Sequence, residues 1–418
     1  MTTRLRRHST ERRRSTNGNL GSGRGRVALA VIVVAVLAVA FLVGGGWYFA
    51  GQIRSDALIP DHSPPQLPLE IRAFQSGSIT LHAGRASEPA LAKPLLDAVI
   101  WPTGDAQVAG AAARTDSADK DVVRPVIAVH GAPPRPGQPA RLDSDYYLGD
   151  PRQALGLDYR DVAYTSPLGE FSAWSVPAES RRSASPATGS VWAVMVHGKG
   201  TSRQEMLRLL SVVHAAGLPA LVITYRNDEG QPADPRGQYR YGATEWRDLD
   251  GAVQYALGQG ATAVVPVGIS MGGGIVASFL QHSPLAGRTA GVILDAPMLN
   301  LGSVVDLGAA QRRLPLLPLP IPAPLTATAQ WLAGRRFGVN WPELNYLRDP
   351  TWVRVWTLVL HGADDTLVPV ADSARLAAAR PELVTLLRFP GADHVGSWNA
   401  DRSRYEQAVR GFLTAVVR

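Results

Sequence analysis

The sequence predicts an α/β protein whose mostly parallel sheet is covered by helices on both faces. Three observations support this fold class. From Gly156 onward, short apolar runs alternate with stretches of helical periodicity. A hairpin signal at residues 167–169, Pro-Leu-Gly, lies between two alternating runs at the start of this region. One apolar run, residues 263–269, ends in Gly-x-Ser-x-Gly and passes directly into a helix-like stretch.

Composition and charge exclude several classes of function. Eight arginines and one glutamate precede Val27, and they account for the whole formal net charge of +7. The rest of the chain is formally neutral and has no basic excess for a polyanion, so we expect no nucleic-acid partner. Cysteine is absent, which excludes disulfides, a thiol nucleophile and zinc–thiolate sites.

Residues 27–50 are predicted to form a transmembrane helix. Residues 27–43 are unbroken apolar sequence, and three glycines and an aromatic group follow, giving about the 20 residues needed to cross a bilayer. By the positive-inside rule, the basic tail of residues 1–26 stays in the cytoplasm, and the rest of the chain crosses the cytoplasmic membrane. A cleaved signal peptide is the alternative. The apolar stretch is long for one, however, and bulky Tyr48 stands where a cut after Ala50 needs a small residue.

The segment that follows the apolar stretch gives weaker signals. Residues 51–68 are short, polar and contain proline, which suits a linker. Residues 69–155 are predicted to be an N-terminal extension of uncertain structure. Strand-like runs are expected at residues 78–82 and 122–130, and a loop at residues 106–121. We assign no chemistry to this extension.

Residues 156–418 carry the alternating pattern, with one long interruption at about residues 298–352. Strands are expected at residues 161–165, 170–176, 191–196, 220–225, 263–269, 292–294, 353–360 and 383–389, and helices at residues 203–216, 244–259, 275–281, 370–379 and 404–417. A hairpin followed by alternating strands and helices implies a mostly parallel sheet.

The strand, glycine-flanked serine and helix around Ser270 form a nucleophile elbow by their order. The turn is so tight that Gly268 and Gly272 must lack side chains. It presents the Ser270 hydroxyl above the sheet edge, and the following helix offers N–H groups and a positive dipole end to a developing oxyanion. Ser270 is therefore the candidate nucleophile.

Two later loops supply the partners that a nucleophilic serine needs. Asp365 follows a late strand, so it falls at the sheet edge where strand carboxyl ends gather. His394 lies in the loop after the final strand, which gives the chain order Ser, Asp, His. His361 is an alternative base, although it precedes the carboxylate, and Asp364 is an alternative acid because adjacent loop carboxylates differ only in direction.

These residues resemble the α/β-hydrolase superfamily over residues 156–418. The resemblance implies a catalytic triad of Ser270, Asp365 and His394, with the His-Gly-x-x-Asp-x-x-Val-Pro pattern placing the acid at Asp365. His-Gly-Lys-Gly at residues 197–200 looks like the family's oxyanion loop, so the backbone N–H groups of Lys199 and Met271 would hold the oxyanion. The single N-terminal helix is similar to that of membrane-tethered serine hydrolases acting on acylglycerols, lysophospholipids or acyl-proteins.

The long interruption falls where this family carries a lid. Within it, residues 314–325 alternate leucine and proline closely enough to exclude a regular helix and favour an extended apolar ribbon. This ribbon is either a rigid packed part of the lid or a surface that contacts membrane or acyl chains, and the sequence leaves both interpretations open.

We therefore expect a membrane-anchored serine hydrolase that cleaves carboxylic esters such as acylglycerols or lysophospholipids, with its catalytic domain outside the cytoplasm. No metal or organic cofactor is implied, and the oligomeric state is undetermined. The first alternative is a serine peptidase similar to prolyl oligopeptidases, since Gly-x-Ser-x-Gly-Gly also occurs there. The second is a non-enzymatic envelope protein that uses the same fold for binding.

Overall fold

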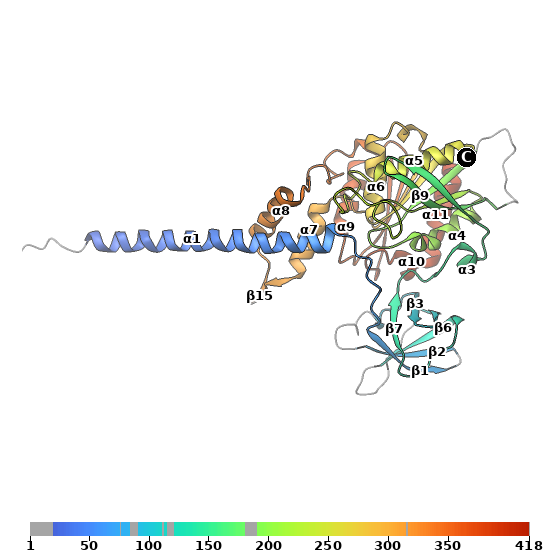
Figure 1. Ribbon diagram of the computed structural model, residues 1–418, viewed down its shortest axis with the longest axis horizontal. Coiled ribbons are helices and arrows are strands. Elements are labelled where there is room, and N and C mark those ends of the chain that lie inside the picture. The colour runs from blue at the N-terminus through green and yellow to red at the C-terminus, as the bar shows by residue number, and fades with distance from the viewer. Residues whose placement is uncertain are drawn as a thin grey trace, which may run out of the picture.

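The computed structural model describes residues 20–75, 77–83, 91–110, 113–114, 121–179, 190–314 and 317–417. These residues form a long N-terminal helix, a small β barrel and a larger α/β domain (Figure 1). Most of the predicted basic tail lies outside the described residues, and residues 20–26 form the first turns of the helix.

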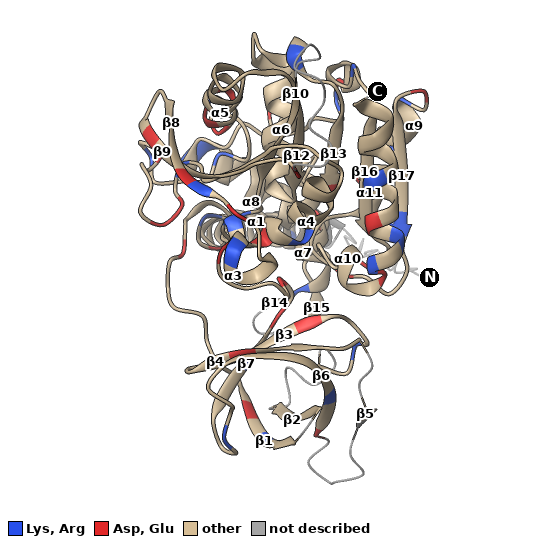
Figure 2. Cartoon of the chain, turned by 90° about the vertical axis from the view of Figure 1, so that its right-hand side faces the viewer, with Lys and Arg blue, Asp and Glu red and all other residues tan. Residues whose placement is uncertain are grey.

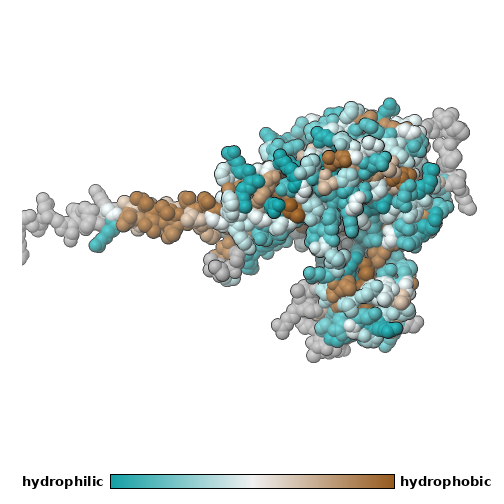
Figure 3. All heavy atoms as spheres, viewed as in Figure 1, coloured by the Kyte–Doolittle hydropathy of each residue, from teal (hydrophilic) through white to brown (hydrophobic). Residues whose placement is uncertain are grey.

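The N-terminal helix α1 (Leu20–Ile53) continues into one π-helical segment, η1 (Arg54–Leu58). Its 34 residues correspond to about 51 Å of helix. The apolar stretch is exposed along its length, and it is long and apolar enough to cross a membrane by length and composition (Figure 3). The helix therefore extends beyond both ends of the predicted span of residues 27–50.

The region predicted as an extension of uncertain structure contains a closed antiparallel barrel. Its strands are β1 (Leu69–Gln75), β2 (Ser78–Ala83), β3 (Asp97–Trp101), β4 (Gly104–Val108), β5 (Ala113–Arg114), β6 (Val122–Gly131) and β7 (Pro139–Asp143). They pair in the order β2-β1-β7-β3-β4-β6, and β6 pairs back onto β2 to close the ring, with β5 added beside β6. Closure removes the free strand edges that an open sheet would expose.

The predicted loop at residues 106–121 is wrong in part, because β4 continues to Val108 and β5 occupies residues 113–114. β3 and β4 form a hairpin whose last pair joins Trp101 and Gly104. Such short strands, containing glycine, aspartate and glutamine, give little periodic signal in a sequence, and pairing in the barrel determines their conformation. Figure 2 shows the barrel below the α/β domain.

The α/β domain contains an eight-stranded sheet in the order β17-β16-β13-β12-β10-β11-β9-β8. Its strands are β8 (Arg160–Ser166), β9 (Gly169–Val176), β10 (Ser190–Val196), β11 (Ala220–Ile223), β12 (Ala261–Ile269), β13 (Val292–Asp295), β16 (Thr357–Gly362) and β17 (Val384–Phe389). Only β9 runs against its neighbours in this sheet, and all other pairs are parallel. The predicted mostly parallel sheet is confirmed.

Helices cover both faces of this sheet. The described helices of the domain, apart from those between β13 and β16, are α3 (Pro151–Leu155), η3 (Arg203–Met206), α4 (Leu207–Ala215), α5 (Trp246–Gly258), α6 (Met271–His282), η4 (Ala286–Arg288), α9 (Val370–Ala379), α10 (Ser397–Ala400) and α11 (Arg402–Val416). Side chains alternate along β10, so that Val194 packs in the core under α5, α6 and α9. Met195 packs in the opposite core under α4 and α11.

One predicted strand begins too early. β16 starts at Thr357, four residues after the predicted start, and η5 (Pro350–Trp352) precedes it. Trp352 and Val353 are fully buried in the core without joining the sheet. Their apolar character reflects packing, which sequence periodicity cannot separate from strand formation over so few residues.

The insertion between β13 and β16 contains two helices, α7 (Leu301–Gln311) and α8 (Ala323–Phe337), and a short hairpin of β14 (Arg313–Leu314) and β15 (Leu317–Pro320). The predicted extended ribbon holds for the hairpin, but its last three residues, 323–325, are the first turn of α8. Pro324 fits there because the first turn of a helix does not use its N–H. Residues 315–316 lie outside the described residues.

Candidate active site

The elbow around Ser270 has the geometry that its sequence predicts. Ser270 has φ 50° and ψ −115° between β12 and α6, a conformation that side-chain-bearing residues rarely adopt. A side chain on Gly268 would lie 2.5 Å from the Gly272 carbonyl oxygen, and one on Gly272 would collide with the carbonyl oxygen of Val196. Both glycines are therefore required for the turn.

Ser270, His394 and Asp365 form a continuous hydrogen-bonded chain. His394 Nε2 lies 2.9 Å from Ser270 Oγ, and His394 Nδ1 lies 2.8 Å from Asp365 Oδ2. The three residues come from the elbow, the loop after β17 and the loop after β16, which meet at the carboxyl edge of the sheet. The structure thus brings together the three side chains that the sequence analysis selected.

The Asp365 carboxylate is fixed from several directions. Its Oδ1 accepts hydrogen bonds from the N–H groups of Leu367 and Val368, both at 2.8 Å. Its Oδ2 also lies 3.1 Å from His361 Nε2. Burial alone would raise the pKa of Asp365, but the hydrogen bonds from His361 and His394 outweigh it and hold the pKa well below its usual range.

The two alternative residues occupy supporting positions. His361 is buried, and its ring contacts Asp365 and the Ser373 hydroxyl, with Nδ1 2.8 Å from Ser373 Oγ. Asp364 Oδ2 accepts a hydrogen bond from the Gly391 N–H at 2.9 Å. Asp364 therefore holds the loop that carries His394, whereas Asp365 contacts the imidazole ring itself.

The loop after β10 lies directly against Ser270. A side chain on Gly198 would approach Ser270 Cβ to 3.3 Å. The Gly198 N–H donates to Glu205 Oε2 at 2.7 Å, and the Gly198 carbonyl accepts from the Tyr225 hydroxyl at 2.7 Å. Both backbone polar groups of Gly198, the residue before Lys199, are thus held by hydrogen bonds.

His197 also fixes this loop, through contacts with Asp228 and Tyr225. Its Nε2 lies 2.9 Å from Asp228 Oδ2, and its ring stacks on Tyr225 with centroids 4.5 Å apart. Burial alone would lower the pKa of His197, but the Asp228 carboxylate outweighs it and the pKa is raised. A fixed loop is what preorganised N–H donors require.

The candidate oxyanion donors lie in the same cavity as the nucleophile. Lys199, Met271, Ser270 and His394 all line one cavity of about 450 Å³. Met271 is the first residue of α6, so its N–H has no partner within the helix. The Lys199 side chain turns away to the Asp56 carbonyl oxygen, with Nζ 2.8 Å from it, so the backbone N–H of Lys199, and not its ammonium group, remains the candidate donor toward Ser270.

The arginine after β11 has a structural role. Arg226 is buried and makes two hydrogen bonds to Asp248, from Nε at 2.7 Å and from Nη2 at 2.9 Å. Because Asp248 belongs to α5, the guanidinium fixes this loop to α5. Within the described ranges, no three His, Asp or Glu side chains come together in a way that would hold a metal ion.

Two contributions to the site were missed by the sequence analysis. Asp393 accepts hydrogen bonds from Thr366 and from the His394 N–H at 2.8 Å, and it also pairs with Lys93 at 3.2 Å. The position of Asp393 directly before His394 in the sequence is the local signal that could have indicated its contact with the His394 backbone. The second contribution is the end of α1, where Phe49 and Ile53 line the cavity. These residues lie more than 200 positions before Ser270, and no local sequence pattern predicts a contact over that separation.

Comparison with known proteins finds only distantly similar sequences among those described below. No protein-family model matches the chain. The uncharacterized protein Rv2307c of Mycobacterium tuberculosis (strain H37Rv) is 28% identical over 236 residues, which are 54% of this chain and 71% of that protein.

Three solved structures that resemble the chain are at most 20% identical to it. The esterase Pf2001 of Pyrococcus furiosus has a TM-score of 0.49 at 19% identity and covers 65% of this chain and 97% of its own. The esterase RhEst1 of a Rhodococcus species has a TM-score of 0.41 at 20% identity and covers 61% and 99%. A membrane phospholipase A, described as a bacterial virulence factor, has a TM-score of 0.41 at 16% identity and covers 62% and 87%.

The chain's own topology assigns its fold. Eight strands with the second antiparallel and the third and fourth exchanged in order, a strained serine between the fifth strand and its helix, and an insertion after the sixth strand define the arrangement. Residues 160–416 have the α/β-hydrolase fold.

Proposed function

We propose that the chain is a membrane-anchored serine hydrolase that cleaves carboxylic esters. The observation that carries this proposal is the chain of hydrogen bonds from Ser270 through His394 to Asp365. A serine hydroxyl is a weak nucleophile, and an adjacent imidazole oriented by a carboxylate is the usual means of activating it.

The reaction proceeds in two half-reactions. His394 Nε2 takes the proton of Ser270 as Oγ attacks the acyl carbonyl, and the Lys199 and Met271 N–H groups stabilise the tetrahedral oxyanion. The bond to the leaving alcohol breaks as His394 returns the proton to the alcohol oxygen. Water, deprotonated by the same imidazole, then attacks the acyl-enzyme and releases the carboxylic acid and free Ser270. Asp365 stabilises the imidazolium throughout.

The character of the cavity favours an ester with an apolar acyl group. Met298, Val304, Val305 and Ile321 line it beside the triad. Cavities of about 300–1,000 Å³ with mainly apolar walls and a few convergent polar groups are typical of small-molecule sites. The apolar helix α1 and the basic residues that precede it favour an anchor with the α/β domain outside the cytoplasm.

Labelling with a fluorophosphonate tests this proposal. Wild-type protein in detergent should be labelled and should hydrolyse p-nitrophenyl esters, and Ser270→Ala should lose both, by about 10⁴-fold or more in turnover. A panel of aminoacyl amides tested in parallel separates esterase from peptidase activity.

Two results would contradict the proposal. Folded wild-type protein that neither reacts with the probe nor turns over any ester would favour the non-enzymatic interpretation. Faster turnover of aminoacyl amides than of esters would favour the peptidase.

A further inference from the structure

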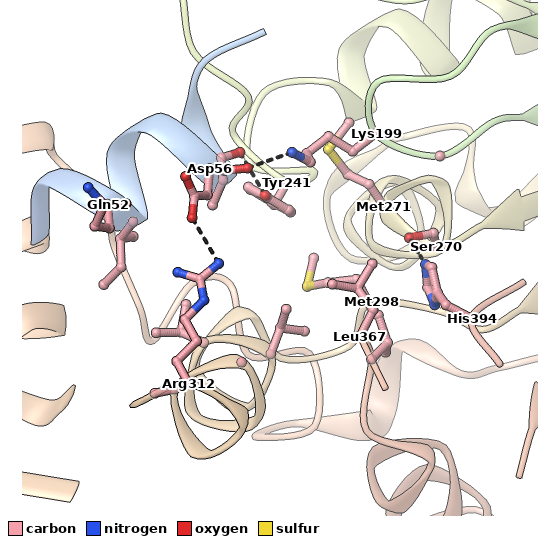
Figure 4. Close-up of a pocket in the computed structure, with 18 of the residues that line it drawn as sticks. Gln52, Asp56, Lys199, Tyr241, Ser270, Met271, Met298, Arg312, Leu367 and His394 are labelled. Atoms are coloured by element: carbon pink, nitrogen blue, oxygen red, sulfur yellow. Dashed lines mark hydrogen bonds and ion pairs between the residues drawn. The ribbon is translucent and has the colours of Figure 1, made fainter. Parts of the chain in front are cut away.

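The wall of the cavity that faces the triad is built by α1, the helix proposed to cross the membrane. Phe49, Gln52 and Ile53 of α1, with Asp56 and Ala57 of η1, line the same cavity as Ser270 and His394. Figure 4 shows Gln52 and Asp56 on one side of the cavity, with Ser270 and His394 on the other. Removal of this helix end would leave the cavity open on that side.

Specific contacts fix the helix end to the α/β domain. The Tyr241 hydroxyl donates to the Ala57 carbonyl at 2.7 Å, and Lys199 Nζ donates to the Asp56 carbonyl at 2.8 Å. The Asp56 carboxylate pairs with Arg312 of the insertion at 2.9 Å. Since the Lys199 backbone is a candidate oxyanion donor, the helix end and the reactive centre share a residue.

The next turns of α1 pack against α8 of the insertion. Gly45 and Gly46 allow the approach, since a side chain on Gly46 would lie 2.7 Å from Thr328 Cγ2 and one on Gly45 would lie 2.9 Å from Leu325 Cδ1. Arg336 donates from Nη1 to the Trp47 carbonyl at 3.0 Å. The insertion and α1 therefore enclose the cavity together.

The enclosed end of α1 begins where its exposed apolar stretch stops. Trp47 and Tyr48 are about half exposed, as expected for aromatic side chains at a membrane–water interface. Phe49 follows them directly, and Ile53 lies about 6 Å beyond Phe49 along the helix at a rise of about 1.5 Å per residue. This placement puts the apolar part of the cavity within about two helical turns of the bilayer surface.

We propose that the end of α1 is the specificity-determining wall of an acyl site, and that the site takes an aliphatic acyl chain of a membrane lipid ester. Phe49 and Ile53 set the length of chain that fits. A lipid in the outer leaflet reaches the site by a short movement along α1, without leaving the apolar environment of the interface. This proposal rests on the proposed esterase function and adds the substrate class to it.

A chain-length series tests the wall directly. The full chain in detergent or lipid vesicles is assayed with p-nitrophenyl acetate, butyrate, octanoate and palmitate. Ile53→Trp fills the site and should lower kcat/KM for palmitate relative to acetate by about tenfold or more, since discrimination in apolar pockets spans about 10–200-fold per small change of fit. Ile53→Phe should change the ratio in the same direction by less. Arg54→Trp is the matched control, because it adds the same ring at the next, exposed position.

The outcomes separate the two proposals. Fluorophosphonate labelling at the wild-type rate shows that a variant retains its triad, and Ile53→Phe replaces Ile53→Trp if the larger substitution prevents folding. An unchanged palmitate-to-acetate ratio in labelled Ile53 variants, or an equal change in Arg54→Trp, overturns the acyl wall and leaves the esterase standing. A wild-type protein that neither labels nor hydrolyses any of the four esters overturns the esterase and, with it, this inference.

Discussion

His361 and Asp365 form a buried pair in which His361 Nε2 lies 3.1 Å from the same carboxylate oxygen that contacts His394. Two imidazoles therefore meet one oxygen, one from the core side and one from the cavity side. Only His394 reaches Ser270 in the described hydrogen bonds, so we expect His361 to act by holding the carboxylate in position.

Removing the His361 ring should lower activity much less than removing the His394 ring. His361→Ala deletes one of several hydrogen bonds to Asp365, and we expect a loss of about 10–100-fold in kcat, by analogy with the loss of outer-shell partners that orient the residues of a metal site. His394→Ala should lose about 10⁴-fold or more. Single-turnover ester hydrolysis by the two purified variants measures the difference, and equal losses would move the base to His361.

Substitution of the adjacent acids should separate their roles. Asp365→Asn keeps the shape but presents an amide to His394 Nδ1, which favours the wrong tautomer and should lower turnover by about 10⁴-fold. Asp364→Asn should cost far less, because Asp364 contacts only loop backbone in its described hydrogen bonds. Steady-state kinetics of both variants ranks them, and the reverse ranking would assign the orienting role to Asp364.

A second buried acid near the elbow should make stability depend on pH. Burial raises the pKa of Asp295 to about 6, although the Tyr405 hydroxyl donates to its Oδ2 at 2.8 Å. The folded protein therefore holds this proton more tightly than the unfolded chain does. The resulting stabilisation is complete below about pH 4 and is lost as pH rises through about 6.

Asp295→Asn removes that titration. The unfolding free energy of wild type minus that of the variant should fall by about 2 kcal/mol between about pH 4 and pH 7. Denaturant unfolding in detergent at several pH values measures this difference, with a substitution at exposed Asp158 as the control. A difference that does not change with pH would show that Asp295 remains ionised in the folded state.

Contact between α1 and α8 can be tested by cross-linking, since the chain contains no cysteine. A side chain on Gly46 would place its Cβ 3.2 Å from Thr328 Cβ, close to the about 3.5–4.5 Å separation in disulfides. Gly46→Cys with Thr328→Cys should therefore form a disulfide on mild oxidation, detected by peptide mass spectrometry. Gly44→Cys with Thr328→Cys is the control, because a side chain on Gly44 would meet no atom within 4 Å. Equal cross-linking of both pairs would argue against the fixed packing.

The orientation of the chain is a separate prediction. The arginine-rich tail should be protected from protease added to intact cells, and a periplasmic-type reporter fused after Arg418 should be active outside the cytoplasmic membrane. A reporter fused there that works only in the cytoplasm would reverse the orientation.

The sequence predicted the α/β-hydrolase fold and the residues of the candidate triad because both depend on local signals. Ser270 sits in a turn that only glycine neighbours permit, and Asp365 and His394 each follow a strand, so strand order alone places them together. Strand ends were less certain where core packing and strand formation use the same residues, as at Val353.

The barrel and the wall of the cavity lay beyond sequence reasoning for a different reason. Closure of the barrel depends on pairing of β2 with β6, about 40 residues apart, and neither strand shows which partner it takes. The contact of Ala57 with Tyr241 spans 184 residues. Such contacts follow from shape complementarity after folding, and a single sequence contains no periodicity that reports them.

The burial of Leu58 beside Tyr239 has a practical consequence for anyone who prepares this protein. A soluble fragment that begins after Leu58 would expose part of the main core and would lack one side of the cavity. Its preference among esters would then describe the fragment rather than the native molecule. If α1 is both the membrane anchor and the acyl wall, as proposed, then proteolytic release of the α/β domain from the membrane would also change its preference among esters.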